Sequence, residues 1–147
     1  MVNSIIIGIS REIGKEFGKK YKVHTESIEQ GLKEPCFFIN CLNPTQKHVY
    51  GYHNIKRYEK QNQFCIQYFP ESEKVNAECN DVAGRMLRCM KYIMPNGAER
   101  PIRGTNMRYE VTDGVLNFFV NYDFYACEMH DPETAMEAIS SVQHVKE

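Results

Sequence analysis

Residues 112–128, "TDGVLNFFVNYDFYACE", decide the fold of this chain because their side chains alternate in character from one position to the next. Apolar residues stand at every even position from 116 to 126: Leu116, Phe118, Val120, Tyr122, Phe124 and Ala126. The odd positions are mostly polar or amphipathic: Asn117, Phe119, Asn121, Asp123 and Tyr125. Alternation at period two is typical of a strand with one buried face. The stretch therefore predicts a long strand whose even-numbered side chains lie in the core.

An Asp-Gly pair, Asp113-Gly114, separates this strand from a second extended run, "IRGTNMRYEVT", at residues 102–112. Asp-Gly between two extended runs is the strongest short-range signal for a two-residue hairpin turn. The expected partners on the apolar face are Val111–Leu116, Tyr109–Phe118 and Met107–Val120, with Thr105 near Tyr122; those on the polar face are Glu110–Asn117, Arg108–Phe119 and Asn106–Asn121. Both strands sort their apolar residues to one side in this register. We therefore predict an antiparallel hairpin at 101–127.

The rest of the chain predicts two helices and several further strands. Apolar positions spaced three or four apart indicate an amphipathic helix over residues 2–18. Strands are expected at 22–26, 36–42, 47–60 and 62–70, and residues 27–35 are expected to form a turn with one helical loop. A second helix follows Pro70, with Ser72 as its N-cap, and "MPNGAERP" ends it. The fold class is α+β: one domain over 1–147, with an antiparallel or mixed sheet covered on one face by two helices.

Composition restricts the classes of function. The chain has 147 residues, 42% hydrophobic and 25% charged, and a net charge of −1. A nucleic-acid binder usually has a basic excess, which this chain lacks overall. No apolar run approaches the roughly 20 residues that span a bilayer, and "IIIGI" at residues 5–9 is too short and lacks the basic leader of a signal peptide. The six cysteines suggest a reducing compartment.

No motif for catalysis, cofactor binding or metal binding stands out. Cys36 and Cys41 fall on opposite faces of a strand, and Cys79 and Cys89 are about 15 Å apart along a helix. The histidines show neither HxH nor HExxH spacing, and the chain has no GxSxG motif or glycine-rich phosphate loop. We therefore expect no enzyme. Two alternatives stay open: an accessory enzyme with a dispersed metal site, and a nucleic-acid-binding module that uses Arg85, Arg88, Lys91 and the arginines of 100–108.

The polar face of the predicted hairpin is the candidate functional surface. The chain has nine Tyr and eight Phe but no Trp. Mixed aromatic and polar side chains on the second face of a sheet suit a protein–protein contact. The candidate contact residues are Arg108, Glu110, Phe119 and Tyr125. A second helix layer, or a solvated face with scattered aromatics, would explain the same pattern.

The motifs also resemble a known family in the order in which they occur. "IIIGISREIGKEFG", "VHTESIEQGLKEPCFFI", "YFPES" before a helix, and "IRGTNMRYEVTDGVLNFFVNYDFY" are similar to the tail terminator proteins of contractile-tailed phages and of phage-tail-like particles of Gram-positive bacteria. The resemblance covers nearly the whole chain except its last residues. It implies a structural protein without cofactor, membrane contact or specific nucleic-acid binding. It further implies a ring, by precedent a hexamer, that assembles in the bacterial cytoplasm and becomes part of the particle. That ring would cap the tail tube, end polymerisation of tube and sheath, and offer a surface to the head connector.

Overall fold

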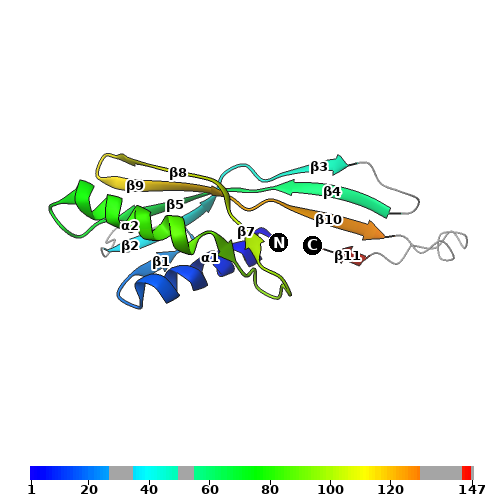
Figure 1. The fold of residues 1–147 in the computed structure, drawn as a ribbon, viewed down its shortest axis with the longest axis horizontal. Coiled ribbons are helices and arrows are strands. Elements are labelled where there is room, and N and C mark those ends of the chain that lie inside the picture. The colour runs from blue at the N-terminus through cyan, green and yellow to red at the C-terminus, as the bar shows by residue number, and fades with distance from the viewer. Residues whose placement is uncertain (27–34, 50–54, 130–143, 147) are drawn as a thin grey trace, which may run out of the picture.

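The computed structural model describes residues 1–26, 35–49, 55–129 and 144–146. Within these residues the chain forms two helices and eleven strands (Figure 1). In chain order they are α1 Val2–Phe17, β1 Lys22–His24, β2 Cys36–Cys41, β3 Thr45–Val49, β4 Ile55–Gln61, β5 Gln63–Phe69, α2 Val75–Cys89, β6 Tyr92–Ile93, β7 Ile102–Arg103, β8 Thr105–Thr112, β9 Val115–Asn121, β10 Phe124–Met129 and β11 His144–Lys146. The expected loop at 27–35 lies almost wholly outside the described residues.

Both helices form for the reason that the sequence indicates, an apolar stripe at helical spacing. α1 buries Ile5, Ile9, Ile13 and Phe17, and it ends at Gly18, whose φ of 88° suits glycine. α2 buries Cys79, Val82, Ala83 and Met86. The expected N-cap of α2 is wrong: the helix begins at Val75 after Lys74. Ser72 instead closes the preceding turn, where its Oγ accepts a hydrogen bond from the backbone N–H of Lys74 at 3.1 Å.

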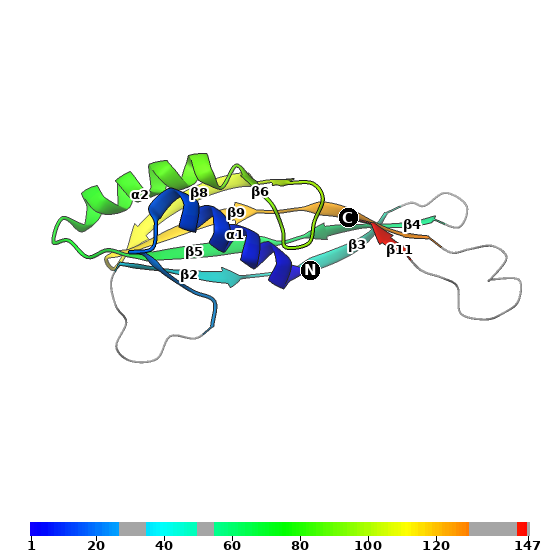
Figure 2. The ribbon, with the colours of Figure 1, turned by 90° about the horizontal axis from the view of Figure 1, so that it is seen from below.

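The core lies between these helices and a five-stranded sheet in the order β1-β2-β5-β9-β8. β1 runs parallel to β2, and the other neighbours are antiparallel, so the sheet is mixed. Figure 2 shows α1 and α2 on the same face of this sheet. The predicted α+β fold, with a mixed sheet and two helices on one face, is confirmed.

Three chain segments continue from this sheet into a second one. The second sheet has the order β11-β10-β4-β3, and β10, β4 and β3 continue β9, β5 and β2 in the same spatial order. The pairing register of the two central segments, β4–β5 and β9–β10, is the same in both sheets, since Gln63 pairs with Asn121 and Lys60 pairs with Phe124. We call β3, β4, β10 and β11 the arm, and the helices with the five-stranded sheet the body. Figure 1 shows the arm extending away from the helices along the long axis.

This continuous ladder explains the alternation at 116–126. Every even-numbered side chain in that range is buried: Leu116, Phe118, Val120 and Tyr122 are 0% exposed, Ala126 is 1% and Phe124 is 9%. A one-residue slip at the junction would have reversed the burial of Phe124 and Ala126. The predicted orientation of the strand is therefore confirmed along its whole length.

The hairpin is shorter than predicted. β8 and β9 pair as expected from Thr112–Val115 to Arg108–Phe119, but the register then shifts, and Thr105 rather than Asn106 opposes Asn121. Asn106 has a φ of 51°, as expected in a bulge. The bulge sets Asn106 and Met107 together against Val120. The expected pairing of Asn106 with Asn121 and of Thr105 with Tyr122 was therefore wrong, and so were the limits 101–127, because the hairpin spans 105–121.

Two backbone contacts explain why the hairpin ends there. Gly104 donates its N–H to the Lys91 carbonyl at 2.8 Å, and β7 pairs with β6 instead of with the strand after Asn121. A Cβ on Gly104 would lie 2.5 Å from the Met90 carbonyl oxygen, so only glycine fits at this position. On the other strand, the edge of β10 that corresponds to the β8 edge of β9 is paired with β11 instead.

The strand expected at 47–60 is also two strands. β3 and β4 pair antiparallel, with Lys47 opposite Glu59, and residues 50–54 between them lie outside the described residues. Of the C-terminal tail at 131–147, the structure describes β11.

Candidate protein–protein interface

A buried polar junction joins the arm to the body. Asn62, between β4 and β5, is 4% exposed and is the one buried polar residue among those described. Its side-chain amide donates to the Tyr122 carbonyl at 3.1 Å, and its backbone N–H donates to Asp123 Oδ1 at 3.0 Å. The Tyr122 N–H donates back to the Asn62 carbonyl at 2.9 Å. These hydrogen bonds connect the β4–β5 segment to the β9–β10 segment at the boundary between the two sheets.

The side chain of Tyr122 anchors the same junction to α2. Its hydroxyl donates to the Met90 carbonyl at 2.7 Å, which satisfies a carbonyl at the C-terminal end of the helix. Burial raises the pKa of Tyr122, so the phenol stays protonated and can donate at any physiological pH. The arm is therefore held to both the sheet and the helix layer.

The face of the five-stranded sheet away from the helices is open in the described part of the chain (Figure 2). Glu110, Asn117 and Gln67 lie opposite one another across β8, β9 and β5. Gln67 Nε2 donates to Asn117 Oδ1 at 3.0 Å, which orders the polar side chains at the centre of this face. The next rung contains Arg108 and Phe119, with the guanidinium carbon 4.0 Å from the ring centroid. That distance is typical of a cation–π contact.

Tyr125 belongs to the same face but to the arm. It is 52% exposed, and the Arg57 guanidinium lies 5.5 Å from the centre of its ring. Because β9 and β10 continue in one register, Tyr125 points to the same side of the ladder as Phe119. Three of the predicted contact residues, Arg108, Glu110 and Phe119, are therefore neighbours on the body, and Tyr125 lies beyond the junction. We call the outer side of both sheets the open face.

Sequence reasoning missed the cations of the arm. Lys47 and the segment "KRYEK" at 56–60 place four cations and one carboxylate on β3 and β4. The sequence shows this cluster of cations. Because the sequence predicted a single strand at 47–60, it did not show that β3 and β4 pair and bring these cations together. Arg57, the partner of Tyr125, belongs to it.

The cations proposed for nucleic-acid binding do not form a free set. Arg85 Nε lies 3.0 Å from Glu16 Oε1, and Arg85 also donates to the Glu16 carbonyl at 2.6 Å. Its guanidinium stacks over Phe17 at 4.3 Å. Arg85 therefore joins α2 to α1, which removes it from the surface that this alternative requires.

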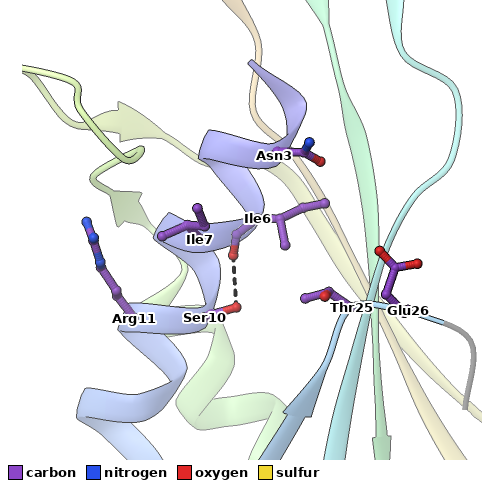
Figure 3. A pocket seen from close by; sticks show the side chains of 7 residues that line it. All are labelled: Asn3, Ile6, Ile7, Ser10, Arg11, Thr25 and Glu26. Atoms are coloured by element: carbon purple, nitrogen blue, oxygen red, sulfur yellow. Dashed lines mark hydrogen bonds between the residues drawn. The ribbon is translucent and has the colours of Figure 1, made fainter.

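A shallow hollow of about 450 Å³ lies between α1 and the end of β1. Figure 3 shows Ile6, Ile7 and Arg11 of the helix on one side and Thr25 and Glu26 on the other. The Ser10 hydroxyl donates to the Ile6 carbonyl at 3.0 Å, so it is already engaged within the helix. Arg11 reaches out of the hollow to Asn96 Oδ1 at 2.9 Å. The hollow holds no nucleophile with a neighbouring base.

The thiols also lack the setting of a reactive site. Cys41, Cys65, Cys79, Cys89 and Cys127 form no disulfide within the described part of the chain. Burial raises the pKa of Cys65, and it raises that of Cys89 to about 12, so both stay protonated and weakly nucleophilic. Among the described residues, no group of three or more His, Cys, Asp or Glu is arranged to hold a metal ion. The described helices are also too short or too polar to cross a membrane.

Comparison with known proteins gives one family. A family model described as phage tail terminator protein matches residues 4–134, which include α2, all but the first two residues of α1, and all strands of the five-stranded sheet. No curated protein matches the chain.

Proposed function

The chain belongs to the phage tail terminator protein family, and from that premise we propose that it caps the end of the tail tube as a ring. The family is structural rather than enzymatic, and as a tail component it associates with the tail tube and belongs to the virion. The observation that carries the proposal is the length of the match, residues 4–134, which spans the body and most of the arm. The ring, its place on the tube and its partners go beyond the family match and are part of our proposal.

A closed ring requires a heterologous interface, in which one patch meets a different patch on the next copy. The open face, with Arg108, Glu110 and Phe119, supplies one patch of suitable chemistry. Arginine and aromatic residues are enriched in such contacts. We propose six copies, to match a six-fold tube, with Arg108 and Glu110 at a subunit or tube contact.

Capping of the tail tube by the ring would have three consequences. It would stop addition of further tube subunits, it would end growth of a contractile sheath at the same level, and it would present a surface to the head connector. Each subunit that binds the tube raises the effective concentration of its neighbours for the remaining contacts. In solution we therefore expect monomers or rings, depending on concentration, rather than a two-fold dimer.

Deletion from the parent particle tests this proposal. We expect tails of irregular excess length, or tails without heads, in electron micrographs, and restoration by the wild-type chain. Complementation with Arg108→Glu should restore fewer complete particles than complementation with Arg103→Glu, a charge-matched control at an exposed position on β7. Uniform, head-joined tails in the deletion strain would refute the proposal.

A further inference from the structure

The arm differs from the body in charge. Four cations, Lys47, Lys56, Arg57 and Lys60, stand on β3 and β4 with one carboxylate, Glu59. β10 adds Glu128, opposite Lys56, and β11 adds Lys146, whereas the whole chain has a net charge of −1. Lys47, Lys56 and Arg57 are exposed. No salt bridge joins these four cations to a described carboxylate. Within the described part of the chain, the arm therefore carries a basic excess.

Aromatic rings accompany these cations on both sides of the arm. Arg57 lies over Tyr125 on the open face, and Lys60 Nζ lies 5.9 Å from the centre of the Phe124 ring on the opposite face. Among the residues that the structure describes, Tyr125 is the most exposed large apolar or aromatic side chain, at 52%. Tyr and Arg are the residue types that most often dominate binding energy at protein interfaces.

The arm is also held in a fixed direction. The Asn62 amide and the Asp123 carboxylate close the junction with hydrogen bonds of 3.1 and 3.0 Å, in a site where the Asn62 side chain is buried. Because this buried junction is hydrogen-bonded on both strands, it orders the arm relative to the body. A preorganised arm loses less conformational entropy when it binds.

We propose that the arm docks on an acidic surface of the tail tube protein, with Arg57 and Tyr125 at the centre of the contact and Lys47 beside them on the same face. This inference rests on the proposed function. The charge is complementary to such a surface, and the exposed arginine–tyrosine pair suits a protein contact.

A protein partner fits better than nucleic acid for two reasons. By strand alternation Lys47 and Arg57 lie on one face of the arm and Lys56 and Lys60 on the other, with Glu59 on the face of Arg57. A phosphate backbone would favour several cations along one face, without a carboxylate among them.

The test is co-sedimentation of the full chain with tubes assembled from the purified tail tube protein of the same phage. We expect wild-type binding that weakens as NaCl rises from about 50 mM to about 300 mM. The double variant Lys47→Glu/Arg57→Glu should bind at least about tenfold more weakly, because it places negative charge against the acidic surface. The control Lys19→Glu/Lys91→Glu, which reverses two exposed cations of the body, should bind as the wild type does.

A milder variant separates charge from geometry. Arg57→Lys keeps the positive charge but loses the planar group over Tyr125, so we expect an intermediate loss of a few fold. All variants should retain the wild-type circular dichroism spectrum, and Arg57→Lys covers the case in which the double variant does not fold.

The outcomes are distinguishable. Wild-type binding together with equal binding by the double variant would refute the role of the arm but leave the capping proposal intact. Failure of the wild type to bind the tubes would refute capping itself. Salt-dependent binding of a labelled DNA duplex that the double variant loses, with tube binding unchanged, would show that the partner is nucleic acid and would overturn the inference.

Discussion

Phe118 and Phe119 are adjacent in sequence but point to opposite faces of β9, so they provide a matched test of the fold. Phe118 is 0% exposed and lies in the core, opposite Ile66 of β5. Phe119 is half-buried on the open face, where its main specific contact is the cation–π pair with Arg108 at 4.0 Å. The same substitution at these two positions should therefore differ several-fold in its effect on stability.

Phe118→Ala removes a fully buried aromatic ring from a close-packed core, which costs roughly 3–5 kcal/mol in the free energy of unfolding. For a domain of this size that corresponds to a fall in Tm of roughly 10 °C. Phe119→Ala loses a partly exposed ring and one surface cation–π contact, together about 1–1.5 kcal/mol.

Urea unfolding followed by circular dichroism measures both values, provided that the slope with urea is the same for the two variants. Phe119→Ala should be closer to the wild type than to Phe118→Ala. Equal destabilisation, or a larger effect at Phe119, would mean that the register of β9 is off by one residue and would refute the assignment of the open face.

Three further predictions concern other parts of the molecule. Burial pushes the pKa of Glu78 upward, but hydrogen bonds from Tyr68 at 2.6 Å and from the backbone of the preceding turn outweigh it and lower the pKa below its usual value. A carboxyl with a lowered pKa stabilises the fold above its unfolded-state pKa, and this stability is lost as pH falls through the folded-state pKa. Glu78→Gln should therefore flatten the decline in Tm between about pH 5 and about pH 3. An unchanged decline would contradict this role of Glu78. Asn62→Ala should cost roughly 1–3 kcal/mol in urea unfolding, because the Tyr122 carbonyl loses its buried donor; a cost below about 0.5 kcal/mol would show that the junction is not held by this bond. All six thiols should react with a thiol reagent in denaturant without reductant, and elemental analysis should find no stoichiometric metal; fewer than six reactive thiols, or one zinc per chain, would revive the enzyme hypothesis.

Period-two alternation and one turn signal predicted the centre of this fold because both act locally. The parity of residues 116–126 is a property of one strand, and Asp113-Gly114 fixes the nearest pairs of the hairpin regardless of what surrounds it. The far end of the hairpin depends on a distant contact, the bond from Gly104 to Lys91 and the lack of space for a Cβ there. No local pattern shows that contact, so the prediction continued the pairing past Thr105.

The candidate contact residues illustrate the same division. The sequence placed Arg108, Glu110 and Phe119 on one face because their register follows from the turn. It placed Tyr125 with them for the right reason, parity, but could not show that Tyr125 belongs to another sheet, because the replacement of β8 by β11 at this edge is a long-range event. The cations of the arm escaped attention because a strand rich in charge carries little apolar periodicity.

The continuous ladder also has a consequence for the order of folding. Strands β5 and β9 are about 50 residues apart in sequence, so their pairing closes a large loop and is expected to form slowly, after the local hairpin of β8 and β9. In the arm, β4 and β10 continue these two strands, and β3 and β4 have few apolar residues of their own. The arm therefore gains a stable register only when the body has formed. A nascent or misfolded chain would therefore not display a correctly aligned Arg57 and Tyr125. Because the arm depends on the body for its register, only chains that have finished folding could make the proposed contact between the arm and the tail tube.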